Sequence, residues 1–125
     1  MGRVLVLTAD LLFGSRIQGD LSAAGHEVEL IADEARLRTR LAEAAMPVAD
    51  VPVADVLVVD LTDAQLDGAT TVEVLSAEGA LGSVRTLGFY SHVDVAARER
   101  AEQAGFDLVV PRSRMAREGA QLVTQ

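Results

Sequence analysis

Short apolar runs alternate along this chain with segments whose apolar residues recur at helical spacing. Val4–Leu7, within a predicted first strand Arg3–Leu7, and Val56–Val59 are continuous apolar runs, typical of strands that are buried on both faces of a parallel sheet. His26–Ile31 alternates polar and apolar residues, which predicts a half-exposed strand nearer the sheet edge. Val84–Tyr90 and Phe106–Val110 are predicted as the fourth and fifth strands.

The first two intervening segments have the pattern of amphipathic helices. Leu11–Ala24 is predicted to be helical and to end at Gly25, a common residue just past a helix end. Its predicted buried face comprises Phe13, Ile17, Leu21 and Ala24. Asp33 can cap the second helix, and Pro47 ends it. The predicted buried face of this helix comprises Leu37, Leu41 and Ala44 or Ala45.

Three further helices follow the later strands. Gly68–Ala80 is the least favourable helix because it is rich in β-branched residues, and Val72 and Leu75 are expected to face inward. Asp94 caps a fourth helix, with small residues on its inner face, and Gly105 ends it. After Pro111, Ser113 is expected to cap a last helix that runs through Leu122.

This pattern is a strand–helix unit repeated five times, within a single predicted domain spanning residues 1–125. Alternating strands and helices imply an α/β fold with a parallel sheet covered by helices on both faces. Right-handed crossovers restrict the topology, and the flavodoxin-like strand order 2-1-3-4-5 fits the count best. Asp10 and Asp60 would then converge at the carboxyl edge of the sheet, where ligands bind in such folds.

Composition narrows the classes of partner. Half the residues are hydrophobic but only 3% are aromatic, so the core must be built from Val, Leu, Ile and Ala. The formal net charge of −8 argues against nucleic acid and anionic membranes as partners. The chain has no cysteine, no signal-peptide pattern and no apolar stretch of about 20 residues. We therefore expect a cytoplasmic protein.

Polar residues at the predicted carboxyl edge are the candidates for function. Asp60 ends the central strand, although such a residue can simply cap the following turn. Asp10 could equally be the N-cap of the first helix. Ser15 and Arg16 lie near that helix start, where an anion could bind, and the alternative is a solvated first turn.

Two further clusters follow the fourth and fifth strands. Tyr90, Ser91 and His92 form a cluster in which His92 could be a metal ligand or a general base, although no second well-placed His or Cys accompanies it. The alternative is that Tyr90 packs in the loop. Arg112 and Arg114 could pair with Asp60 or bind an external anion, or lie in a solvated turn. The dinucleotide fingerprint, the P-loop and the Gly-x-Ser-x-Gly elbow are all absent, so we expect no enzyme of those classes.

A five-unit domain of this length, with Asp60 ending the third strand and Asp10 after the first, resembles the receiver domain of two-component response regulators. The resemblance covers nearly the whole chain. It implies two adjacent acids that bind Mg²⁺, an aspartate that accepts a phosphoryl group, a Ser or Thr ending the fourth strand, and a Lys ending the fifth.

Carried over by position, the resemblance makes Asp60 the phosphoacceptor and Asp10 the second acid. Ala9 replaces the first acid. The hydroxyl of the fourth strand falls on Tyr90 or Ser91. The lysine position falls on Pro111, and Arg112 is the nearest cation.

These replacements imply a degenerate receiver, or pseudo-receiver, that works by protein contact and is not an enzyme. It would be a stand-alone module, and the partner could be a second copy bound through the fourth helix, fifth strand and fifth helix. That interface would involve Ala96, Arg100, Leu108 or Met115. No cofactor is required, although Asp10 and Asp60 could hold Mg²⁺ weakly. The alternatives are a genuine phosphoacceptor that uses Asp60 and a binder of small anions or nucleotides.

Overall fold

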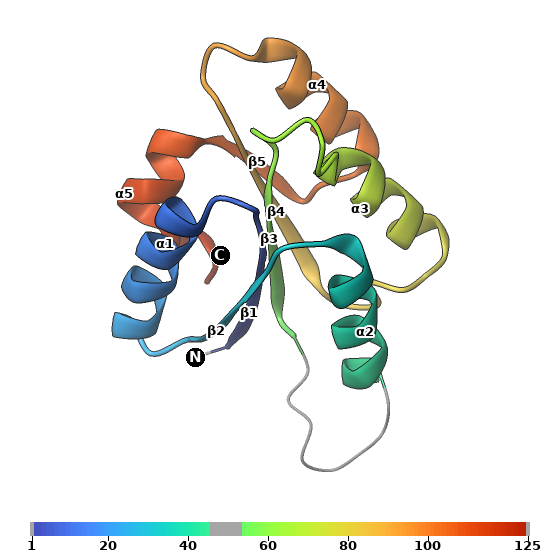
Figure 1. Ribbon diagram of the computed structural model, residues 1–125, viewed down its shortest axis with the longest axis horizontal. Coiled ribbons are helices and arrows are strands. Elements are labelled where there is room, and N and C mark those ends of the chain that lie inside the picture. The colour runs from blue at the N-terminus through green and yellow to red at the C-terminus, as the bar shows by residue number, and fades with distance from the viewer. Residues whose placement is uncertain (1, 46–53, 125) are drawn as a thin grey trace.

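The computed structural model describes residues 2–45 and 54–124, in which strands and helices alternate (Figure 1). The strands are β1 (Arg3–Leu7), β2 (Glu27–Ile31), β3 (Val56–Asp60), β4 (Arg85–Tyr90) and β5 (Leu108–Pro111). The helices are α1 (Leu11–Ala23), α2 (Glu34–Ala45), α3 (Gly68–Ala77), α4 (Val95–Ala104) and α5 (Arg112–Leu122). Each predicted element is present.

The strands form one parallel sheet in the order β2-β1-β3-β4-β5, which confirms the predicted topology. Helices α1 and α5 cover one face of the sheet, and α2, α3 and α4 cover the other (Figure 1). The molecule is therefore a three-layer sandwich of the flavodoxin-like type, in which β1 and β3 lie side by side at the switch point.

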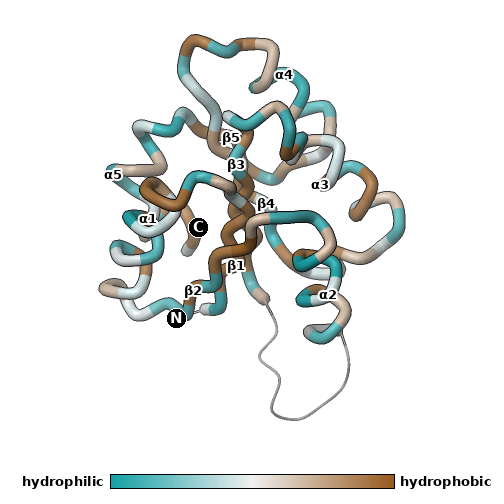
Figure 2. The backbone as a smooth tube through the Cα atoms, viewed as in Figure 1, coloured by the Kyte–Doolittle hydropathy of each residue, from teal (hydrophilic) through white to brown (hydrophobic). Residues whose placement is uncertain are grey.

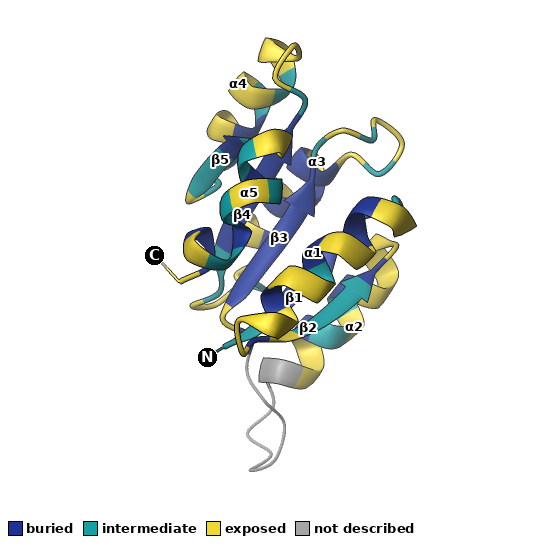
Figure 3. Ribbon diagram, turned by 90° about the vertical axis from the view of Figure 1, so that its left-hand side faces the viewer, coloured by how far each residue is buried: buried dark blue, intermediate teal, exposed yellow. Residues whose placement is uncertain are grey.

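Strand β3 divides its side chains between two hydrophobic clusters. Val56 and Val58 belong to the cluster beneath α1 and α5, whereas Leu57 and Val59 belong to the cluster beneath α2 and α3. Every residue of β3 is buried, as Figure 3 shows, and apolar residues concentrate along the central strands in Figure 2. No helix in the part of the chain that the structure describes is long and apolar enough to cross a membrane.

In the first two helices the apolar periodicity predicted most of the buried residues correctly. Phe13, Ile17 and Leu21 are buried as predicted, but Ala24 is exposed because α1 ends at Ala23. Asp33 caps α2 by accepting a hydrogen bond of 2.8 Å from the amide of Arg36. Leu37 and Leu41 are buried as predicted. The side chains of Ala44 and Ala45, and Pro47, lie outside the described residues.

The last strand–helix unit differs from the prediction at its junction. Pro111 is the final residue of β5, which an edge strand tolerates, and its fixed φ leads directly into α5 at Arg112. The prediction that Ser113 caps this helix was wrong, because α5 begins at Arg112, two residues earlier than that cap implies, and has no side-chain cap. Met115 is 1% exposed and packs in the core, so its proposed place at a surface interface was also wrong.

Close packing explains why α3 begins with a glycine. A Cβ atom at Gly68 would overlap Cγ1 of Val59 and lie 3.3 Å from the carbonyl oxygen of Asp60. The start of α3 therefore lies directly against the end of β3, despite the weak helix propensity of the sequence that follows. Gly19 in α1 has open space at the corresponding position.

We expect Gly68→Ala to lower the free energy of unfolding by about 1–3 kcal/mol, because the added methyl group has no room against Val59. Gly19→Ala is the matched control and should raise this free energy by about 0.5–1 kcal/mol, since it improves helix propensity without a clash. Urea denaturation measures both. Equal effects of the two substitutions would contradict the close approach of α3 to β3.

Candidate functional site

The carboxylate of Asp60 is buried at the end of β3, and the residue is only 1% exposed. Its Oδ2 accepts a hydrogen bond of 2.7 Å from the hydroxyl of Thr8. Its Oδ1 accepts hydrogen bonds from the hydroxyl of Thr62 at 2.5 Å and from the amide of Thr62 at 2.8 Å. We call Thr8, Asp60 and Thr62 the threonine clasp, since both carboxylate oxygens are held by threonines.

The clasp follows from strand register and local turn geometry. Leu7 of β1 pairs with Val59 of β3, so Thr8 and Asp60 both come directly after paired residues. Thr62 lies two residues beyond Asp60, and a bond from an aspartate to the amide two positions later is a common turn motif. The hydrogen bonds offset the cost of burying a charge. Sequence reasoning missed both threonines, although the Asp-x-Thr spacing was a usable signal.

The carboxylate of Asp10 does not share the partners of Asp60, although the two acids are linked through Thr8. Its Oδ1 accepts a hydrogen bond of 3.0 Å from the amide of Phe13, which confirms the alternative that Asp10 caps α1. Its Oδ2 pairs with the guanidinium of Arg112 at 3.2 Å. The amide of Asp10 donates to the hydroxyl of Thr8 at 3.1 Å, so this one hydroxyl lies between the two acids.

The two acids at this edge are engaged within the fold and do not form a ready-made Mg²⁺ site. Mg²⁺ requires near-octahedral oxygen ligands, and here the oxygens of Asp10 and Asp60 already accept hydrogen bonds or ion pairs. Within residues 2–45 and 54–124, no group of three or more His, Asp or Glu side chains is close enough to hold a metal.

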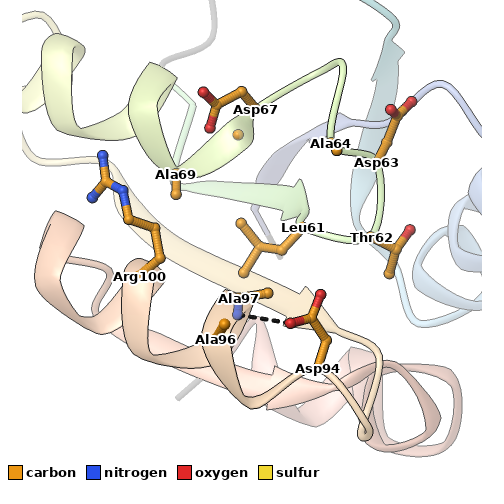
Figure 4. Close-up of a pocket in the computed structure, with 11 residues that line it drawn as sticks. Leu61, Thr62, Asp63, Ala64, Asp67, Ala69, Asp94, Ala96, Ala97 and Arg100 are labelled. Atoms are coloured by element: carbon orange, nitrogen blue, oxygen red, sulfur yellow. Dashed lines mark hydrogen bonds between the residues drawn. The ribbon is translucent and has the colours of Figure 1, made fainter.

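One hollow at the carboxyl edge, of about 320 Å³, lies between the loop after β3 and the start of α4 (Figure 4). Asp63, Asp67 and Asp94 line it, and each accepts a hydrogen bond from a backbone amide two or three residues later. Arg100 extends toward α3, as Figure 4 shows, and pairs with both carboxylate oxygens of Glu73 at 3.1 Å. The charged groups of this hollow are thus engaged within the fold.

A second hollow, of about 420 Å³, collects most of the predicted site residues. We call it the arginine pocket, and it is lined by Phe13, Arg16, Thr62, Ser91, His92, Arg112, Ser113 and Ala116. It brings Arg16 of α1 together with Arg112 of α5, which are 96 positions apart in the sequence. Ser15 and Arg114, also predicted to bind anions, do not line it, and Arg114 pairs with Glu118 at 3.3 Å.

Arg112 is held in place by an aromatic ring and a carboxylate. Its guanidinium carbon lies 4.1 Å from the centre of the Phe13 ring, and Phe13 in turn packs against Phe89 at 5.1 Å between ring centres. The ion pair with Asp10 fixes one end of the guanidinium. These two contacts orient the guanidinium of Arg112 at the pocket. Its place directly after β5 would not by itself fix the direction of such a long side chain.

Tyr90 occupies the end of β4 and is 7% exposed. Asp60 pairs with Phe89 in the sheet, so Tyr90 is the first residue beyond that pair and Ser91 is the second. The hydrogen bond to Glu102, followed by the electrostatic interaction with Tyr90, raises the pKa of Arg98. The Tyr90 phenol thus lies near Arg98 of α4, whereas Ser91 lines the arginine pocket.

We expect Thr8→Val to lower the free energy of unfolding by about 1–3 kcal/mol, because it leaves Oδ2 of Asp60 and the amide of Asp10 without their partner. Thr39→Val, on the exposed side of α2, is the control and should change it by no more than about 0.5 kcal/mol. Thermal and urea denaturation provide the comparison. A Thr8→Val protein as stable as the control would show that the clasp contributes nothing.

No protein-family model matches the chain, and no curated protein matches it in sequence. Solved structures do match the chain in their three-dimensional fold. The receiver domain of the TMAO respiratory response regulator TorR is 17% identical, with 99% of this chain and 94% of that chain covered and a TM-score of 0.80.

Two other response-regulator structures also match the fold of this chain. The chemotaxis protein CheY4 of Vibrio cholerae is 15% identical over 99% of this chain and 97% of that chain, with a TM-score of 0.79. The receiver domain of NarL from Mycobacterium tuberculosis is 22% identical over 98% and 93%, with a TM-score of 0.72. The chain therefore has the fold of response-regulator receiver domains.

Proposed function

We propose that this chain is a receiver-like signalling module that works through protein contact and not through phosphorylation of Asp60. In this proposal it acts in the cytoplasm and binds partners without catalysing a reaction. The receiver fold supports the general class. The threonine clasp is the single observation that carries the departure from phosphotransfer.

Phosphorylation of a carboxylate needs an oxygen that is free to attack the phosphorus atom. Both oxygens of Asp60 accept hydrogen bonds, and the residue is almost completely buried. Transfer also needs cations near the phosphoryl group to neutralise its charge. The resemblance places Ala9 where an acid would bind Mg²⁺ and Pro111 where a lysine would stand, and the sequence contains no lysine.

Exposed apolar side chains at the carboxyl edge support protein contact. Leu11 and Leu12 at the start of α1 are 71% and 87% exposed. Val93 and Val95, at the start of α4, are 75% and 58% exposed. Leu12 directly precedes Phe13 and Val93 directly follows His92, two residues that line the arginine pocket, so exposed apolar residues are adjacent in sequence to the pocket and are available to a partner.

A second copy of the chain is one candidate partner, through the face of α4, β5 and α5. Ala96 is exposed there, but Arg100 is already held by Glu73 and Leu108 packs partly into the core. Light scattering at rising protein concentration distinguishes a homodimer from a monomer that binds a different protein. A strict monomer at high concentration would exclude the homodimer and leave a different protein as the partner.

We expect no mass gain of a phosphoryl group when the protein is incubated with acetyl phosphate and Mg²⁺, because hydrogen bonds lower the nucleophilicity of both oxygens of Asp60 and burial limits access to them. Intact-protein mass spectrometry measures this. Asp60→Asn should behave like the unaltered protein, and a receiver domain with both acids and the lysine, treated in parallel, shows that the donor is active. A Mg²⁺-dependent gain that Asp60→Asn abolishes would instead establish the alternative, a genuine phosphoacceptor.

A further inference from the structure

The arginine pocket is positively charged at its lining, although the chain as a whole carries a net charge of −8. Its lining residues include two guanidiniums, three hydroxyls and an imidazole, and none of those identified carries a carboxylate. We propose that this pocket binds a phosphate group non-covalently, either as free phosphate or as part of a small phosphorylated molecule. This inference goes beyond the proposed function and does not depend on it.

Arg16 brings a positive charge that the fold does not neutralise. Most arginines of the described chain have an ion-pair partner, namely Arg3, Arg36, Arg38, Arg40, Arg98, Arg100, Arg112 and Arg114. Within the described ranges Arg16 has neither an ion pair nor a side-chain hydrogen bond, and it lines the pocket. Arg85 and Arg117 also lack an ion pair there, but neither of them lines the pocket.

Arg112 is oriented before any ligand arrives. Phe13 supports the face of its guanidinium, and Asp10 accepts from one terminal nitrogen. A guanidinium has five N–H donors, so Arg112 keeps several for an external acceptor. Because the side chain is already ordered, binding an anion costs less conformational entropy than it would with a free arginine.

Neutral donors complete the lining. Among the described residues, the hydroxyls of Ser91 and Ser113 take no part in the hydrogen bonds of the fold, whereas the hydroxyl of Thr62 is used by Asp60. Ser113 is the second residue of α5, an 11-residue helix whose N-cap, Pro111, contributes no side-chain bond. The first amides of such a helix have no intrahelical partner and add to the preference for an anion.

The arrangement favours phosphate over a carboxylate. Guanidinium groups match the geometry of phosphate oxygens with paired hydrogen bonds, and here they approach from two separate helices. A terminal phosphate offers three strong acceptor oxygens, enough for both arginines and a serine at once. The volume of about 420 Å³ lies within the usual range for small-ligand pockets and exceeds what phosphate alone fills.

The experiment is an amide NMR titration with inorganic phosphate, compared with sodium chloride at equal ionic strength. Inorganic phosphate is not a phosphoryl donor, so the response reports non-covalent binding whether or not Asp60 can be phosphorylated. We expect saturable shifts at Arg16, Ser91, His92, Arg112 and Ser113. Absence of saturable shifts with phosphate, or equal shifts with chloride, would overturn the proposal.

A second arm uses adenosine 5′-monophosphate to identify the source of the phosphate group. Tighter binding than inorganic phosphate, with the same amides shifted, would support a small phosphorylated molecule that fills the remaining volume. Weaker binding than inorganic phosphate would support free phosphate as the ligand. Shifts from both ligands that lie away from the pocket would contradict the site itself.

Three variants and one matched control test the residues. Arg16→Gln and Arg112→Gln should each weaken phosphate binding by at least about tenfold, because each removes charge-assisted hydrogen bonds. Asp10→Asn keeps a good cap for α1 and removes a negative charge beside Arg112, whose guanidinium Phe13 still supports, so binding should tighten. Arg114→Gln makes the same charge change on α5 outside the pocket and should bind phosphate like the unaltered protein.

Amide spectra of each variant without phosphate establish that the fold is intact before affinities are compared. Weakening by Arg114→Gln equal to that by Arg112→Gln would show that only overall charge matters and would overturn the site. Asp10→Asn binding phosphate more weakly than the unaltered protein would contradict the role assigned to Arg112.

Discussion

The carboxylate of Asp60 is the one charge that β3 carries into the interior, and satisfying it determines how the carboxyl edge is built. A buried charge without partners would cost several kcal/mol, so each oxygen must be hydrogen-bonded. Thr8 reaches it from β1 and Thr62 from the loop that leads toward α3. The same contact therefore ties together two neighbouring strands and the loop after the central one.

The structure continues outward from this contact to the surface. The hydroxyl of Thr8 accepts from the amide of Asp10, Asp10 caps α1 and pairs with Arg112, and Arg112 lies over Phe13. The centre of the sheet, the start of α1 and the start of α5 are thus joined by direct contacts. The arginine pocket lies at the end of this series, which is why two guanidiniums from helices far apart in sequence are near each other.

Most of the fold could be predicted from the sequence because it rests on signals local to each element. The apolar runs of β1 and β3, the helical periodicity of α1 and the aspartate cap of α2 each need only a few neighbouring residues. The threonine clasp could not be predicted in this way, since Thr8 and Asp60 are 52 residues apart. The start of α5 at Arg112 was not predicted because Pro111 is both the last residue of β5 and the N-cap of α5.

Receiver geometry persists here at 15–22% identity to the compared structures, because the fold depends on the burial pattern and not on the residues at the edge. Edge residues such as Ala9 and Pro111 can depart from the receiver pattern without disturbing the hydrophobic clusters. What they change is the placement of charge. The resemblance puts a cation at the end of the fifth strand, close to the aspartate. In this chain the cations come from helix residues Arg16 and Arg112 around a pocket, while hydroxyls occupy the aspartate. Under the proposals made above, positive charge placed around a hollow and not beside Asp60 would favour an anion that enters and leaves over one that is bonded to the protein.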